Sequence, residues 1–123
     1  MEFMVVVEGD AGGWKVDREA LTEVIRAHWP DVRTDRTDRS EVRSVIWEME
    51  TEYGWGEAYL HRDGTCLYLD VWEKDAIRLA TAFRHLTPPH LRLVFCDEGY
   101  SYDVRVPAGA TEEELAELVR TAG

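Results

Sequence analysis

The chain of 123 residues is poor in cysteine, in lysine and in long apolar runs, and each shortage excludes a class of protein. Its two cysteines, Cys66 and Cys96, lie far apart without a Cys-x-x-Cys spacing, so neither a disulfide scaffold nor a zinc site is indicated. No stretch approaches the roughly 18 apolar residues that a membrane-spanning helix needs. The opening MEFMVVVEGD has no basic segment and is typical of a strand, so we expect no signal peptide and a cytoplasmic location.

Positive charge is also scarce. The chain has 14 Lys and Arg against 25 Asp and Glu, which gives a formal net charge of −11 at pH 7. Such a protein repels nucleic-acid phosphates and anionic lipids, so we expect neither nucleic acid nor a membrane as a partner. It attracts basic proteins, although the simplest explanation of the charge is solubility.

The apolar residues that are present suffice for one core. A hydrophobic fraction of 45% with five tryptophans predicts a single globular domain over residues 1–123. The patterns predict strands at 3–7, 44–53, within 55–72 and within 91–106, and helices after Asp17, at 73–86 and at 111–121. The order is β-α-β-β-β-α-β-β-α. Because hairpins dominate it, we expect an α+β fold, a mostly antiparallel sheet of about six strands with helices packed on one face.

The helix ends carry recognisable signals. Asp17 can cap the first helix, and Pro30 ends it. Pro88-Pro89 stops the second helix. Thr111 and Glu114 have the spacing of a capping box ahead of the third helix.

The segment LVFCDEGYSYDVRV (93–106) raises the question whether Cys96 is a nucleophile. Burial sets strand register, because a slip by one residue sends every side chain to the other face. A turn at Glu98-Gly99 leaves Cys96 and Asp103 on the polar side, and no base is placed beside the thiol. We therefore predict a structural thiol and assign no catalytic residue. The predicted apolar pairs are Leu91–Val106, Leu93–Val104 and Phe95–Tyr102.

The segment WGEAYLHRDGTCLYLDVW (55–72) is predicted to be a hairpin, since Asp63-Gly64 supplies the positive φ angles of a tight turn. One face of it is apolar, with Ala58 opposite Leu69 and Leu60 opposite Leu67. The other face pairs Trp55–Trp72, Glu57–Asp70, Tyr59–Tyr68 and His61–Cys66. We treat seven of these residues as a candidate ligand- or partner-binding site: Trp55, Glu57, Tyr59, His61, Tyr68, Asp70 and Trp72.

The pair Glu57–Asp70 is the unusual one. Cross-strand aromatic pairs stabilise a hairpin by about 0.2–1 kcal/mol, whereas facing carboxylates destabilise it. Two acids framed by aromatic rings suit a cation, a guanidinium group or a basic side chain. The simpler explanation is that a helix or strand covers the rings, with the acids paired to Arg62, Arg78 or Arg84.

Other chemistries have weaker support. Glycosidases use two carboxylates about 5–10 Å apart, but a chain of this length leaves little room for a sugar cleft. Glu57, Asp70 and His61 have the residue types of a metal site but an unspecific spacing, so we predict no metal and no cofactor. GDAGGWK (9–15) departs from the phosphate-loop pattern and is interpreted as a glycine-rich loop. RTDRTDRSEVR (33–43) mixes both charges and is typical of a solvated loop.

These observations favour a non-enzymatic binding module that captures a basic protein partner on an acidic and aromatic surface. Inhibitors and immunity proteins provide an analogy at the level of size and charge. The alternative is a small-molecule-binding protein or a minor enzyme, with a pocket between the polar sheet face and a helix. A homodimer formed through that face is compatible with either hypothesis.

Overall fold

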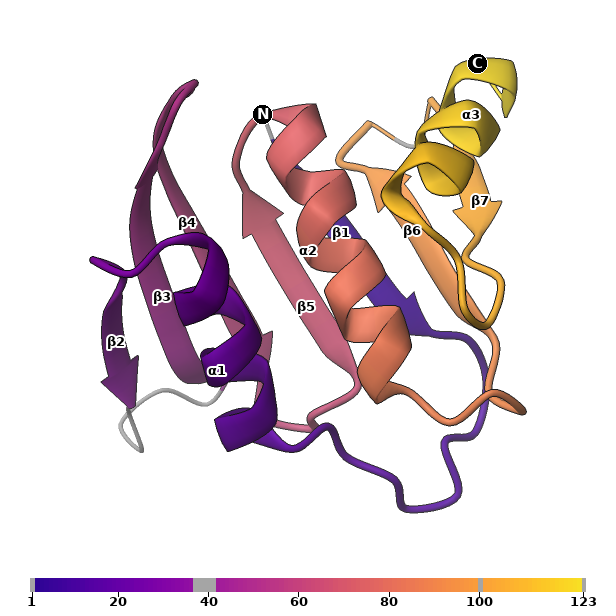
Figure 1. The fold of residues 1–123 in the computed structure, drawn as a ribbon. Helices are drawn as coiled ribbons and strands as arrows, with labels where there is room; N and C mark the ends of the chain where they lie inside the picture. The colour runs from indigo at the N-terminus through magenta and orange to yellow at the C-terminus, as the bar shows by residue number, and fades with distance from the viewer. Residues whose placement is uncertain (1, 37–41, 100, 123) are drawn as a thin grey trace.

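The structure is a computed structural model and describes residues 2–36, 42–99 and 101–122. A seven-stranded antiparallel sheet, in the order β2-β3-β4-β5-β1-β6-β7, forms one layer of the described chain. Helices form the second layer and lie on one face of this sheet (Figure 1). The strands are β1 (Glu2–Val7), β2 (Arg33–Arg36), β3 (Arg43–Thr51), β4 (Gly54–His61), β5 (Cys66–Asp70), β6 (Leu93–Asp97) and β7 (Asp103–Arg105). The helices are α1 (Arg18–His28), α2 (Glu73–Leu86) and α3 (Glu112–Ala122).

The predicted α+β class and the placement of the helices on one face are confirmed. The prediction of a loop over 33–43 is wrong at its start, because Arg33–Arg36 forms the edge strand β2. Arg33 lies opposite Glu48 on β3, and Thr34 lies opposite Trp47. The opposite charges of the first pair and the inward side chain of Thr34 hold this short strand against β3. Its charged residues are typical of an edge strand that is protected from further pairing. Residues 37–41 of the predicted loop lie outside the described part.

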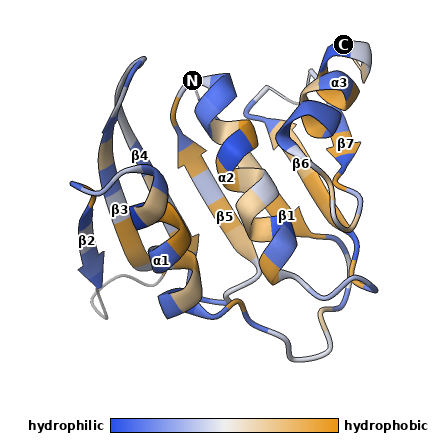
Figure 2. Cartoon of the chain, in the orientation of Figure 1, coloured by the Kyte–Doolittle hydropathy of each residue, from blue (hydrophilic) through white to orange (hydrophobic). Residues whose placement is uncertain are grey.

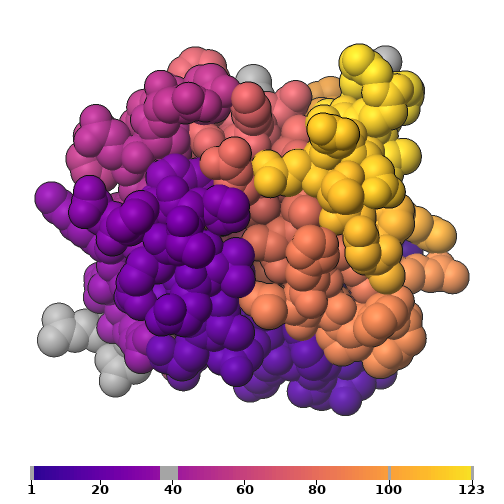
Figure 3. All heavy atoms as spheres, viewed as in Figure 1, coloured from indigo at the N-terminus to yellow at the C-terminus, as the bar shows by residue number. Residues whose placement is uncertain are grey.

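The core lies between the sheet and the helices. Figure 2 shows apolar residues along β1, β5 and β6, whereas β2 is hydrophilic. Phe3 of β1 and Phe95 of β6 stack with ring centroids 5.7 Å apart. Trp47 of β3 is fully buried and donates its indole N–H to Thr22 of α1 at 3.1 Å, so burial leaves no unsatisfied donor on that ring. In the space-filling view, the atoms of the helices close over this side of the sheet (Figure 3).

The predicted helix ends are confirmed. Asp17 caps α1, since its Oδ1 accepts the backbone N–H groups of Glu19 at 2.9 Å and Ala20 at 3.1 Å. At the start of α3, the Thr111 hydroxyl oxygen accepts the Glu114 N–H at 3.1 Å. Helix α2 has the predicted bounds, and its buried side chains include Ala76, Ala80 and Phe83. These caps satisfy backbone donors that a free helix end would expose.

The central rungs of the β4–β5 hairpin are confirmed: Glu57–Asp70, Ala58–Leu69, Tyr59–Tyr68 and Leu60–Leu67. The two outer pairs of the prediction do not form as sheet pairs. Trp72 is the N-cap of α2, because the chain leaves the sheet after Asp70. At the other end, the Thr65 carbonyl accepts the N–H of Val7, and His61 Nδ1 accepts the N–H of Asp63 at 3.1 Å. The His61–Cys66 rung is therefore replaced by a wider turn.

The β6–β7 register differs from the prediction by two residues. Phe95 lies opposite Val104, not Tyr102, and Cys96 lies opposite Asp103. The reason is a wider loop, in which the Asp97 carboxylate accepts both the N–H and the hydroxyl of Ser101. A shift by two residues keeps every side chain on its face. Phe95 and Val104 are accordingly buried while Asp103 is exposed, as expected.

Gly56 shows how closely β4 packs against the segment that joins β5 to α2. A Cβ at this half-buried position would lie 2.5 Å from Cγ1 of the buried Val71. We predict that Gly56→Ala lowers the free energy of unfolding by about 1–3 kcal/mol, the usual cost of overpacking. Urea denaturation measures this change. Gly99→Ala is the matched control, because no atom lies within 4 Å of a Cβ there. Equal stability of the two variants would contradict the packing described here.

Candidate functional site

The sheet face opposite the helices is the candidate site. All seven predicted site residues lie on it or at its margin, and we call them the acid–aromatic face: Trp55, Glu57, Tyr59, His61, Tyr68, Asp70 and Trp72. The described helices cover the other face of the sheet (Figure 1). Trp55 is 62% exposed and Trp72 is 59% exposed. Cover by one of the described helices, which was part of the simpler explanation, therefore does not hold for these two rings.

The aromatic residues form two groups. Tyr59 and Tyr68 stack across the β4–β5 rung with ring centroids 4.6 Å apart and planes 17° apart. His61 lies at the edge of this pair, with its ring 6.5 Å from that of Tyr68. Trp55 and Trp72 line a common hollow of about 550 Å³ together with Asp70. The two tryptophans thus come together, although they do not form the predicted strand pair.

The acid pair belongs to a longer row that the sequence analysis missed. Glu48 lies opposite Glu57, Glu57 opposite Asp70, and Asp70 opposite Glu2. Carboxylates therefore occupy one rung of β3, β4, β5 and β1, which we call the acid row. Neighbouring strands are about 4.8 Å apart, and facing like charges destabilise a sheet. Alternation along β3 places Glu48 on the polar face, but nothing local in the sequence indicates that β1 pairs with β5 and adds Glu2.

Arg43 is the cation next to the centre of the acid row. Its guanidinium carbon lies 4.3 Å from the centroid of the Tyr59 ring, and its Nη1 lies 3.8 Å from Glu57 Oε1. At this distance the ion pair is a loose one between partly exposed groups, which contributes little to stability. Partial burial raises the pKa of the Tyr59 hydroxyl, against the opposing effect of Arg43. Tyr59 is therefore neutral at physiological pH.

Two of the arginines that the sequence analysis considered as partners are engaged elsewhere. Arg78 Nε lies 3.2 Å from Glu112 of α3. Arg84 is buried and donates to the carbonyls of Leu91 and Pro88, each at 2.8 Å. Arg84 therefore ties the end of α2 to the loop before β6. The row meets a cation at its β2 end, where Arg33 lies opposite Glu48 and 5.9 Å from the centroid of Trp55.

Trp55 stands beside the acid row. A hollow of about 340 Å³ is lined by Trp55, Gly56 and three carboxylates of the row, Glu48, Glu57 and Asp70. This hollow and the one shared with Trp72 have Trp55 and Asp70 in common. An aromatic face next to several carboxylates offers a cation both π-electron density and negative charge. The arrangement can therefore hold a guanidinium or ammonium group.

The described residues give no support to a metal site. Within them, no group of three or more His, Cys, Asp and Glu side chains is placed to hold a metal ion. Glu57 and Asp70 are neighbours, but His61 lies further along β4, with its Nδ1 3.4 Å from Asp63. His61 therefore does not complete a ligand set with the two acids.

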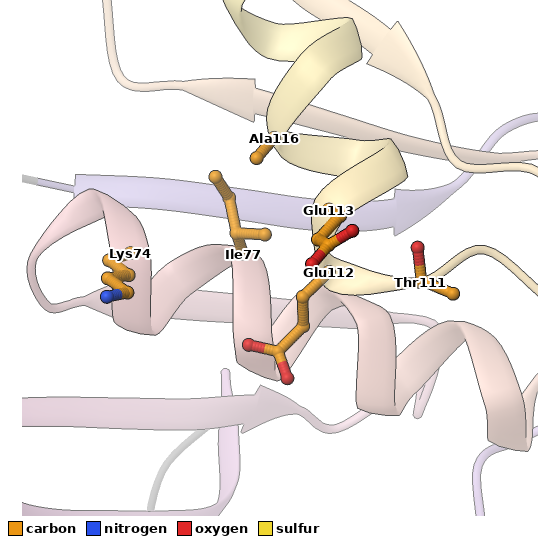
Figure 4. Close-up of a pocket in the computed structure, with 6 residues that line it drawn as sticks. All are labelled: Lys74, Ile77, Thr111, Glu112, Glu113 and Ala116. Carbon is orange, nitrogen blue, oxygen red and sulfur yellow. The ribbon is translucent and has the colours of Figure 1, made fainter.

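A hollow on the helix side differs in character. It has a volume of about 620 Å³ and is lined by Lys74, Ile77, Thr111, Glu112, Glu113 and Ala116. Ile77 of α2 points toward Ala116 of α3, whereas the Glu112 carboxylate points away from it (Figure 4). Its floor is thus apolar and its rim is charged. The candidate residues of the sequence analysis do not take part in it.

Comparison of the chain with protein-family models, with curated proteins and with solved structures finds no match. Among the described helices, none combines the length and the apolar character that crossing a membrane requires. The functional argument therefore depends on the geometry and charge of the acid–aromatic face itself.

The two thiols are predicted to be unreactive in the folded protein. Both cysteines are buried, and burial raises the pKa of Cys66 from 9.0 to about 12 and also raises the pKa of Cys96. The thiolate fraction of Cys66 is then roughly a thousandfold below that of an ordinary thiol. We expect a soluble aromatic disulfide to label neither cysteine rapidly at pH 8, and both within seconds to minutes in denaturant. Rapid labelling of the native protein would contradict this burial.

The acid row is predicted to destabilise the folded chain. Replacing Glu57→Gln together with Asp70→Asn removes adjacent like charges, so the free energy of unfolding should rise by a few tenths of a kcal/mol. Urea denaturation at low salt measures the change, and added salt should reduce it by screening. The control, Glu23→Gln with Glu113→Gln, removes two exposed charges from the helices, of which Glu23 forms a surface ion pair with Arg26 that contributes little to stability. A clear loss of stability in the row variant alone would show that the acids hold the fold together.

Proposed function

We propose that the protein is a non-enzymatic binding module whose acid–aromatic face captures a basic segment of a protein partner. The observation that carries this proposal is the acid row beside two exposed tryptophans, on a sheet face that the described helices leave open. The net charge of −11 favours a basic partner, because opposite charges attract across an interface.

The repulsion within the acid row supports a basic occupant. Facing carboxylates make a folded sheet less stable, so a fold that keeps them retains an unfavourable interaction. A guanidinium or ammonium group placed between Glu57 and Asp70 would convert that repulsion into attraction. Arginine suits the position best, since its planar fork can bind a carboxylate through two parallel hydrogen bonds.

The tryptophans support a protein partner. Trp, Tyr and Arg dominate the energetically important contacts of protein interfaces, and large exposed aromatic rings are otherwise unfavourable on a soluble surface. Trp55 and Trp72 flank the hollow next to Asp70 and can receive the apolar stem of a long basic side chain. The Tyr59–Tyr68 stack provides a rigid wall on the other side of the acid row.

The alternatives have less support from the geometry. A small-molecule site was expected between this face and a helix, but the described helices lie on the opposite face. A homodimer that joined two copies of the face would place one acid row near the other, which adds repulsion. A glycosidase mechanism needs carboxylates on both sides of a sugar bond, whereas these acids lie in one row along a sheet.

The proposal predicts saturable binding of a peptide of alternating arginine and glycine, followed by tryptophan fluorescence. Glu57→Gln with Asp70→Asn should raise the Kd about tenfold, a loss of about 1.4 kcal/mol, and Trp55→Ala should have a comparable effect. Affinity should fall as salt is added.

The helix-side variant, Glu23→Gln with Glu113→Gln, tests whether net charge alone attracts the peptide. It has the same net charge as the row variant, so its Kd should stay close to that of the original protein. Equal weakening by both variants, or no saturable binding at all, would overturn the proposal. Crosslinking in the native cell, compared between the original protein and the row variant, then identifies the partner whose capture depends on the row.

A further inference from the structure

One hollow of this acidic protein is lined by cations. Lys15, Arg18 and Arg62 line a cavity of about 240 Å³, together with Val16, Ser44, Leu60 and Gly64. The chain has only 14 Lys and Arg, so three of them in one small hollow is a strong local concentration of positive charge. The cavity lies near the β4–β5 turn, whereas Trp55 lies at the other end of β4. It shares no lining residue with the hollows that Trp55 lines.

The backbone around the cavity is held by a close contact between two loops. The N–H of Val16 donates to the carbonyl of Gly64 at 2.9 Å. A Cβ at Gly64 would lie 2.9 Å from Lys15 Cβ, so only glycine allows the loops to come this close. Gly64 also has a φ of +72°, which favours glycine in any case. Lys15 is thus held beside the turn that carries Arg62.

The nearest acids along the chain are committed elsewhere. Asp17 accepts two backbone N–H groups at the start of α1, and Asp63 lies 3.4 Å from the His61 ring nitrogen. Within the described chain, neither Lys15 nor Arg18 forms an ion pair with a carboxylate. The like charges of Lys15 and Arg18, which border one cavity, repel each other unless an anion lies between them.

We propose that this hollow binds a phosphate-type oxyanion. Its volume is below the about 300–1,000 Å³ that pockets for drug-sized molecules have, so it suits a single small group. The ammonium group of Lys15 and the guanidinium group of Arg18 match the charge and the several acceptor oxygens of a phosphate. Ser44 also lines the cavity, and its hydroxyl donates to the Leu60 carbonyl at 3.4 Å.

Occupation would join three segments of the chain. Lys15 and Arg18 belong to the entry of α1, Ser44 to β3, and Arg62 to the β4–β5 turn. A ligand that binds only the folded state raises the stability of the fold by mass action. Phosphate should therefore raise the melting temperature in a saturable manner, beyond the general stabilisation that excluded salts give to every protein.

The test is a titration with inorganic phosphate, followed by phosphorus NMR and by the melting temperature, with sodium chloride at matched ionic strength as reference. Lys15→Gln with Arg18→Gln should raise the Kd by about tenfold or more. The matched control is Arg26→Gln with Arg120→Gln, which removes two cations from exposed helix surfaces where each pairs with a glutamate. Its affinity should be unchanged. If the double variant does not fold, Lys15→Gln alone gives the same comparison.

The outcomes separate a built site from general salt effects. Saturable binding that the cavity variant loses and the control keeps supports the proposal. An equal response of both variants, or no saturable response of the original protein, overturns it. A phosphoserine peptide forms the second arm of the experiment. Binding of this peptide that depends on the same residues shows that the site accepts a phosphate group carried by a protein, while binding of inorganic phosphate alone shows that it accepts the free ion.

Discussion

The insertion of β1 between β5 and β6 is the constraint on which the rest of the structure depends. Antiparallel pairing of β1 with both strands joins β2-β3-β4-β5 and β6-β7 into one sheet. The alternation of β1 sends Phe3 into the core, where it stacks on Phe95, and places Glu2 on the other face opposite Asp70. A single register therefore completes the core and extends the acid row.

The sequence predicts those structural features that depend on residues close together in the chain. Alternation on both sides of the Asp63-Gly64 segment predicts the central β4–β5 rungs, although the turn itself is closed by the Gly64 N–H and the His61 carbonyl. The caps and prolines set the helix ends, since each is a local interaction. The β6–β7 hairpin shows the limit of this reasoning. Alternation fixes which face of the sheet a side chain occupies, but it leaves the register free to shift by two residues. In this hairpin the contact of Asp97 with Ser101 accompanies the observed register.

The whole acid row could not be predicted because Glu2 comes from a strand that is distant in sequence from the other three. Glu57 and Asp70 belong to one hairpin, and their pairing was predicted. Glu2 joins them only because the N-terminal strand pairs with β5, and that pairing is set by burial of the whole sheet. The cationic cavity was not predicted either, because the contact of Val16 with Gly64 brings together residues from segments that are distant in sequence.

The fold separates the parts that stabilise it from the parts available for binding. Helices α1, α2 and α3 bury the apolar side of every long strand, so the opposite side can carry charges and exposed rings with little cost to the core. Opposite charges then gather at different places along β4, with acids near Trp55 and cations near the turn after Leu60. A partner with separated basic and acidic groups would be oriented by this arrangement as well as attracted by it, because each of its ends favours a different end of the strand.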